Sequence, residues 1–124
     1  MAQTQTRCGT ISQGEGQLFR FTEAGTANTN LTSSMAAQGC PFRLISVEIH
    51  YSAAPTQAGT TVTLNSGAGS AYDTVLDTGT ANAQSTLYIP THDCLFGADD
   101  GIDVTALAGG VGITAAVSIY IEKL

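Results

Sequence analysis

The sequence contains no tryptophan and very little charge. Charged residues make up only 11% of its 124 residues, against about 25% in an ordinary soluble domain. Ten Asp and Glu outnumber four cations, so the formal net charge is -6, and the cations are scattered at Arg7, Arg20, Arg43 and Lys123. Because a phosphate-binding face needs clustered cations, we expect no direct contact with nucleic acid.

Long apolar runs are also absent. No stretch approaches the ~20 apolar residues that a membrane-spanning helix needs. Residues 1–6 are polar apart from Met1 and Ala2, and they lack the basic and apolar parts of a secretion signal. We therefore expect a chain that is made in the cytoplasm, remains soluble and has no membrane partner.

The cysteines are few and widely spaced. Cys8, Cys40 and Cys94 are an odd number, which neither closes a disulfide framework nor matches a paired zinc-ligand pattern. Free thiols in a reducing compartment are the simplest interpretation.

What the sequence does contain is a succession of short segments in which apolar and polar residues alternate. In the clearest one, residues 44–52, Ile45, Val47, Ile49 and Tyr51 are expected on one face and polar residues on the other. The last segment, residues 112–122, is expected to place Ile113, Ala115, Val117, Ile119 and Ile121 on one face. Further strands are predicted over residues 17–22, 60–64, 73–77, 85–90 and 102–107. Residues 35–38 could form one turn of helix, and no longer helix is expected.

These segments predict an all-β fold, a single antiparallel β-sandwich. The 8–12-residue spacing of the strands is typical of a sandwich, and about eight strands would suit a jelly roll, which protects strand edges. Residues 1–41 are rich in Gln, Thr, Gly and Asn and are expected to carry one or two strands. We divide the chain into an extended N-terminal arm, residues 1–16, and a β-sandwich domain, residues 17–124.

Two clusters of polar residues could hold a metal ion, and each has a plainer interpretation. Residues 99–103 place three aspartates around Gly101, as a calcium loop does, but they lack the remaining ligands of an EF-hand. An acidic turn leading into a strand is the simpler alternative. His50 could meet the segment His92-Asp93-Cys94 as metal ligands or as a Cys-His pair. Since nothing in the sequence fixes their separation, a solvated His50 is the simpler alternative.

Neither the glycines nor the tyrosines define a site. The Gly-rich segments 67–69 and 109–112 do not lie between a strand and a helix, so they are expected to be hairpin connections and not nucleotide-binding loops. Tyr72 and Tyr88 could stand on an exposed face and stack on a sugar. We assign no catalytic, cofactor-binding or metal-binding residue, expect no cofactor, and do not expect an enzyme.

Three runs of sequence resemble a known group of proteins. They are residues 43–56 (RLISVEIHYSAAPT), residues 62–76 (VTLNSGAGSAYDTVL) and residues 99–104 (DDGIDV). Together they look like small virion proteins that tailed bacteriophages encode among their head genes. The resemblance covers about the last two-thirds of the chain, and the polar start up to Gln17 has no counterpart in it.

The resemblance implies a jelly-roll capsid decoration protein, also called a cement protein. Such a protein binds the outside of the phage head, contacts the major capsid protein, often forms a homotrimer, and stabilises contacts between capsomers. It would be made in the host cytoplasm and located in the virion, on the capsid exterior. The alternative is a virion-associated adhesion or carbohydrate-binding β-sandwich module of a tail or head fibre, since one fold serves many functions.

Overall fold

The computed structural model describes residues 4–10, 17–56, 59–79, 82–91 and 94–124. These ranges contain ten β-strands and one turn of 3-10 helix, η1 (Ser70–Tyr72). The strands are, in chain order, β1 (Thr4–Thr10), β2 (Gln17–Thr26), β3 (Leu31–Met35), β4 (Phe42–Tyr51), β5 (Thr60–Asn65), β6 (Thr74–Thr78), β7 (Ser85–Tyr88), β8 (Cys94–Phe96), β9 (Gly101–Ala106) and β10 (Thr114–Lys123). Within these ranges, no helix is long and apolar enough to cross a membrane.

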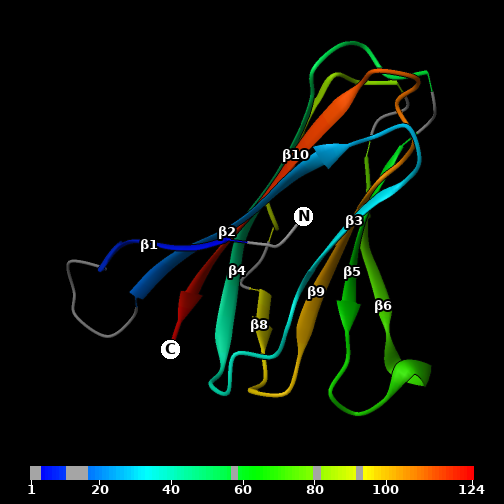
Figure 1. Cartoon of the computed structure of the whole chain (residues 1–124). Helices are drawn as coiled ribbons and strands as arrows, with labels where there is room; N and C mark the ends of the chain where they lie inside the picture. The colour runs from blue at the N-terminus through cyan, green and yellow to red at the C-terminus, as the bar shows by residue number, and fades with distance from the viewer. Residues whose placement is uncertain (1–3, 11–16, 57–58, 80–81, 92–93) are drawn as a thin grey trace.

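The strands form two antiparallel sheets that pack face to face (Figure 1). Sheet A has the order β1-β2-β10-β4-β7, and β8 pairs with the first residues of β4. Sheet B has the order β3-β9-β5-β6. The prediction of an all-β, antiparallel sandwich is confirmed.

The strands are connected in the order of a jelly roll. When β7 and β8 are taken as one interrupted strand, four strands lie in each sheet besides β1. The chain passes from one sheet to the other after β2, β3, β4, β6, β8 and β9, as the two Greek keys of a jelly roll require. β1 lies outside this set of eight strands. It extends sheet A beyond β2, with pairs from Thr4↔Thr22 to Thr10↔Gln17, and it is the described part of the arm predicted over residues 1–16.

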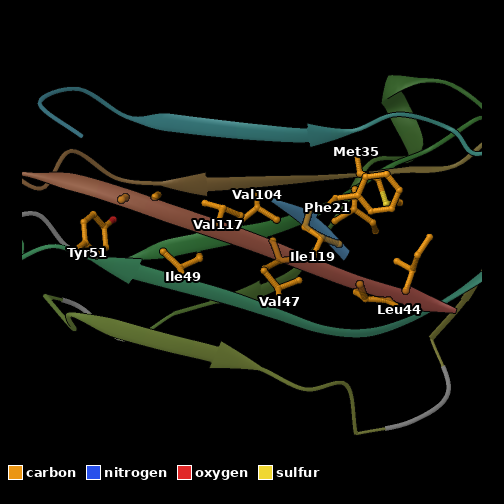
Figure 2. Packing of buried hydrophobic residues seen from close by; sticks show 14 of the residues in the cluster. Phe21, Met35, Leu44, Val47, Ile49, Tyr51, Val104, Val117 and Ile119 are labelled. Carbon is orange, nitrogen blue, oxygen red and sulfur yellow. The ribbon is translucent and has the colours of Figure 1, made fainter. Parts of the chain in front are cut away.

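The core fills the space between the two sheets (Figure 2). β10 lies in the middle of sheet A, and its alternate residues Ala115, Val117, Ile119 and Ile121 are all buried, as the sequence predicts. The other buried apolar side chains are Phe21, Ala27, Met35, Phe42, Leu44, Val47, Ile49, Tyr51, Val62, Ile102, Val104 and Ala106. Each large aliphatic side chain in this set contributes about 1.5–3 kcal/mol of burial free energy.

A β-bulge in β4 changes the face of one predicted core residue. Ser46 pairs with Tyr120, but the next residue of β10, Ile121, pairs with Leu44. Ile45 is therefore the extra residue, and an extra residue reverses the alternation of the strand on one side of it. The expectation that Ile45 belongs to the inner face is wrong: Leu44 is buried in the core, whereas Ile45 is half-buried.

Several described strands differ from the sequence prediction. Residues 1–41 contain three described strands, β1, β2 and β3, where the sequence predicts one or two. β3 covers a polar segment, Leu31–Met35, so Met35 ends a strand instead of beginning a helical turn. β3 pairs with β9, and Ser33 is buried in it. β8 covers Cys94–Phe96, a segment for which the sequence predicts no strand. Phe96 packs beside Phe42, with ring centroids 5.3 Å apart.

Candidate interaction surface

The outer face of sheet A carries a network of polar side chains. Arg20, on β2, directs Nε and Nη2 to the hydroxyl of Ser118 at 3.4 and 3.3 Å. Its guanidinium also lies 5.9 Å from the ring centroid of Tyr120, within the range of a cation–π contact. The Tyr120 hydroxyl in turn donates a hydrogen bond to the Glu48 carboxylate at 3.3 Å. The network therefore links the three central strands β2, β10 and β4.

A second contact on this face is the ion pair between Arg43 and Glu122. Arg43 Nε donates to Glu122 Oε1 at 2.7 Å, and Nη2 forms a salt bridge with the same oxygen. Glu122 is only 7% exposed. Because a carboxylate with so little water around it needs a compensating charge, Arg43 makes burial of Glu122 tolerable.

Beside this network, β4 and β7 enclose a shallow groove of about 370 Å³. Its lining residues are Glu48, Ile49, His50, Ser85, Thr86 and Leu87. His50 Nδ1 lies 2.6 Å from the Ser85 hydroxyl. Since Nδ1 is occupied by Ser85 and the described residues place no acid on Nε2, the pair lacks the orienting group that activates a catalytic serine. In this groove the Glu48 carboxylate can accept hydrogen bonds, and the His50 imidazole and the Ser85 hydroxyl can donate or accept them.

Exposed aliphatic side chains lie next to the groove. Leu87, Ile89 and Leu95 are 57%, 60% and 59% exposed, and we call these three residues the β7–β8 patch. Leu87 is paired with Glu48 and Leu95 with Arg43, so both stand on the outer face of sheet A, because paired residues share a face. Ile89 follows directly after β7. Large aliphatic side chains on a polar face are typical of a surface that contacts another molecule.

Sequence reasoning did not find the β7–β8 patch. The alternation in residues 85–90 separates Thr86 and Tyr88 from Leu87 and Ile89, but alternation alone does not say which pair faces the core. The structure turns Tyr88 toward the core and leaves Leu87 outside. Only the pairing of β7 with β4, which the sequence does not reveal, identifies the face.

The acidic turn has a structural role in the loops at one end of the sandwich. Asp100 accepts hydrogen bonds from the backbone N–H groups of Gly67 and Gly97, both at 2.8 Å. A Cβ at Gly67 would come within 2.5 Å of Asp99, so the two loops touch closely and glycine is required there. Among the described residues, no group of three or more His, Cys, Asp or Glu side chains could hold a metal ion. The simpler interpretation, an acidic turn before a strand, fits this geometry.

The structure separates His50 from Cys94. His50 pairs with Ser85, whereas Cys94 pairs with Leu44, six residues away along β4. At about 3.4 Å per residue, this places the two roughly 20 Å apart. His92 and Asp93 lie outside the described residues. The structure therefore does not bring His50 and Cys94 together as a pair.

The two tyrosines considered for sugar stacking lie in different surroundings. Tyr72, on η1, is 66% exposed, as expected. Tyr88 is half-buried and packs against the core, so it does not stand on an exposed face. Burial raises the pKa of Tyr88 above its usual value, and contacts with Cys94 and the negative charge of Asp77 add to this shift.

One of the two Gly-rich segments lies in a hairpin, as predicted, because residues 67–69 stand between β5 and β6, which pair in sheet B. The prediction is wrong for residues 109–112, because β9 and β10 lie in different sheets. Residues 67–69 join β5 to η1, and residues 109–112 join β9 to β10. Gly69, Gly110 and Gly112 have positive φ angles, which L-residues rarely adopt. Neither segment leads into a helix of the kind that binds a phosphate group.

Comparisons with known proteins identify no family for this chain. Neither a protein-family model nor a curated protein matches the chain. Among solved structures, the core of Drosophila NLP aligns at a TM-score of 0.44 and 16% identity, covering 86% of this chain and 98% of that one. The family 32 carbohydrate-binding module of C. perfringens NanJ, solved with galactose, aligns at 0.41 and 11%, covering 95% and 93%. Pseudomonas aeruginosa AlgX aligns at 0.46 and 14% over 89% of this chain, which spans 27% of that protein.

Proposed function

We propose that this chain is a decoration protein of a tailed-bacteriophage head, which binds the capsid exterior and stabilises contacts between capsomers. The observation that supports this function best is the β7–β8 patch, where three aliphatic side chains are exposed beside the polar network of sheet A. Such patches on soluble domains favour contact with another protein. The resemblance of residues 43–56 and 62–76 to small head proteins points in the same direction.

A protein that holds capsomers together must be stiff, and the loops at the other end of the sandwich are joined by hydrogen bonds. Tyr51 Oη donates to the carbonyl of Leu107 at 2.8 Å. Asn30 Oδ1 accepts from the backbone N–H of Ala108 at 2.9 Å. These bonds tie the loop after β9 to β4 and to the segment before β3, so a force on one sheet is passed to the other.

The proposed partners are the major capsid protein and two further copies of this chain. A homotrimer suits the local threefold positions of an icosahedral shell, because closed cyclic symmetry leaves no open contact. The arm, residues 1–16, is a further contact element, since a segment can add a strand to a neighbour's sheet edge. With a net charge of -6, the protein is repelled by packaged DNA and suits the outer surface. The proposal includes no catalytic activity and no cofactor.

Two measurements test the proposal. Heads purified from a phage that carries this gene, with the gene deleted, are mixed with the purified protein and sedimented. Saturable binding at a fixed number of copies per head supports decoration, and absence of binding overturns it. Light scattering of the free protein then gives its mass, and the trimer predicts three chains of 12.7 kDa.

Carbohydrate binding is the second candidate, and one observation favours it. The groove presents the carboxylate of Glu48, the imidazole of His50 and the hydroxyl of Ser85 side by side, and sugars are held by such converging polar groups. Its described lining, however, contains no Phe or Tyr ring on which a sugar could stack. A glycan array with the wild-type chain and with His50→Ala tests this candidate: binding that His50→Ala abolishes supports it.

A further inference from the structure

We infer that the β7–β8 patch and Glu48 form one docking site for a protein surface that presents aliphatic side chains beside a Lys or Arg. This inference rests on the proposed function and identifies the surface of the chain that meets the capsid. It is carried by three features of the described residues: where the apolar side chains lie, how the charges are paired, and how the edge strand is built.

The apolar part of the site is contiguous with its acidic part. Leu87 is the direct cross-strand neighbour of Glu48, and paired side chains lie within about 5 Å of each other. Ile89 and Leu95 are exposed further along the same edge of sheet A, where Ile89 follows β7 and Leu95 pairs with Arg43. A partner that covers Leu87 therefore also covers the carboxylate of Glu48.

Among the described side chains, no cation is paired with Glu48 to neutralise it when it is covered. In the described part of the chain its hydrogen bond comes from the Tyr120 hydroxyl, which carries no charge. Arg20 contacts Ser118 and the Tyr120 ring, and Arg43 is paired with Glu122. Because burying an unpaired carboxylate is costly, a stable contact over this site needs a cation from the partner.

A second copy of this chain fits the site poorly. Of the three cations whose side chains the structure describes, Arg20 and Arg43 are engaged as above, and Lys123 lies over the Phe19 ring, 4.1 Å from its centroid. A twofold contact through the patch would bring Glu48 toward a chain that also carries a net charge of -6. Like charges facing each other oppose such a contact, so the charge pattern favours a different protein.

β7 and β8 form one edge of sheet A, and their short length determines how a partner can bind there. β7 has four residues and β8 three, and Pro90 lies between them. A short, interrupted edge with a proline resists addition of a further strand. The partner therefore meets this site through side chains and not by extending sheet A.

The small size of the site indicates that one copy of it binds its partner weakly. Three side chains that are a little more than half exposed supply much less than the roughly 800 Å² per partner of a standard interface. A multimeric protein on a repeating lattice makes several such contacts at once, and their combined affinity exceeds that of any one. This requirement agrees with attachment to a capsid.

The experiment measures binding of four chains to the gene-deleted heads by sedimentation at two salt concentrations. They are the wild type, Leu87→Ser/Ile89→Ser, Glu48→Gln, and the control Val111→Ser. Val111 is 96% exposed in the connection between β9 and β10, so its replacement removes an exposed aliphatic side chain that is not part of the patch. All four substituted positions are exposed, and matching unfolding midpoints verify that each variant folds.

The site predicts at least about tenfold weaker binding for Leu87→Ser/Ile89→Ser and no change for Val111→Ser. Glu48→Gln keeps an acceptor for Tyr120 but loses the charge, so it is expected to bind more weakly and with less dependence on salt. If the wild type binds heads and the double variant binds equally well, the docking site is wrong and the decoration function stands. If the wild type does not bind heads, the decoration function is wrong and this inference falls with it. An unchanged salt dependence for Glu48→Gln overturns the requirement for a basic partner residue.

Discussion

Replacing Tyr51 by phenylalanine removes one hydroxyl and leaves the packing of the ring in place. Tyr51 is 1% exposed, and its hydroxyl donates a 2.8 Å hydrogen bond to the carbonyl of Leu107. Without this donor, a partly buried carbonyl in the loop after β9 loses a partner. The loss of such a bond costs about 1–2 kcal/mol, and we therefore expect Tyr51→Phe to lower the unfolding midpoint by roughly 4–8 °C.

The same substitution has a pH signature. Burial raises the pKa of Tyr51 above its usual value of 10.0. In the unfolded chain the hydroxyl ionises near pH 10, so its contribution to stability is fully present below pH 10 and is lost as the pH rises through the folded-state pKa. The difference in unfolding free energy between the wild type and Tyr51→Phe should therefore shrink above pH 10. The pKa of Tyr88 is also raised, so the ionisation of Tyr88 lowers the stability of both chains at alkaline pH.

Urea unfolding followed by circular dichroism at neutral pH and above pH 10 measures both effects. Tyr72→Phe makes the same chemical change at a residue that is exposed, and it should leave the stability unchanged at neutral pH. If Tyr51→Phe is as stable as the wild type at neutral pH, the bond to Leu107 does not stabilise the fold and this reasoning is refuted. A difference that stays constant above pH 10 would refute the ionisation argument alone.

Three further predictions concern the fold and the arm. Arg43→Met should lower the unfolding free energy by roughly 1–3 kcal/mol, because it leaves Glu122 without its partner. We expect a value in the lower half of that range, because Arg43 is partly exposed. Urea unfolding measures this change, and equal stability would contradict it. Ile119→Ala, in the buried middle of β10, should cost about 2–5 kcal/mol in the same assay, and a cost below that range would mean that the core collapses around the gap. Deleting residues 2–14 removes β1 and should leave a folded domain by circular dichroism with weakened binding to heads; unchanged binding would count against a role for the arm.

How far the sequence predicts this fold depends on the hydrophobic period of each strand. β10 alternates strictly, from Ala115 to Ile121, and its buried face follows directly from the sequence. β4 looks equally regular, but the bulge at Ile45 lies in its pairing with β10, which no pattern within residues 44–52 records. β3 is an edge strand of sheet B, and its two buried residues are Ser33 and Met35. Because a serine occupies one of these buried positions, the alternation of apolar and polar residues is too weak to predict a strand.

The interaction surface was less predictable than the fold. Its residues come from segments far apart in the chain, and they meet only because β7 pairs with β4 and β4 with β10. A contact such as Tyr120 with Glu48, 72 residues apart, depends on strand order, which one sequence does not contain. The scarcity of cations is visible in the sequence. Together with the strand order, it explains why no described cation is paired with Glu48.

The position of β10 has a consequence for how the molecule is made. The last described strand, β10, lies at the centre of sheet A, between β2 and β4. Its partner β2 comes from near the start of the sequence, and the pairing runs from Gln17↔Lys123 to Thr26↔Thr114. Sheet A therefore cannot complete its pairing until residue 123 has left the ribosome. Because nearly all its pairings join distant residues, folding should be slow, on the millisecond-to-second scale of all-β domains. A chain that ends before β10 lacks the strand that joins the two halves of sheet A, and remains a target for proteolysis.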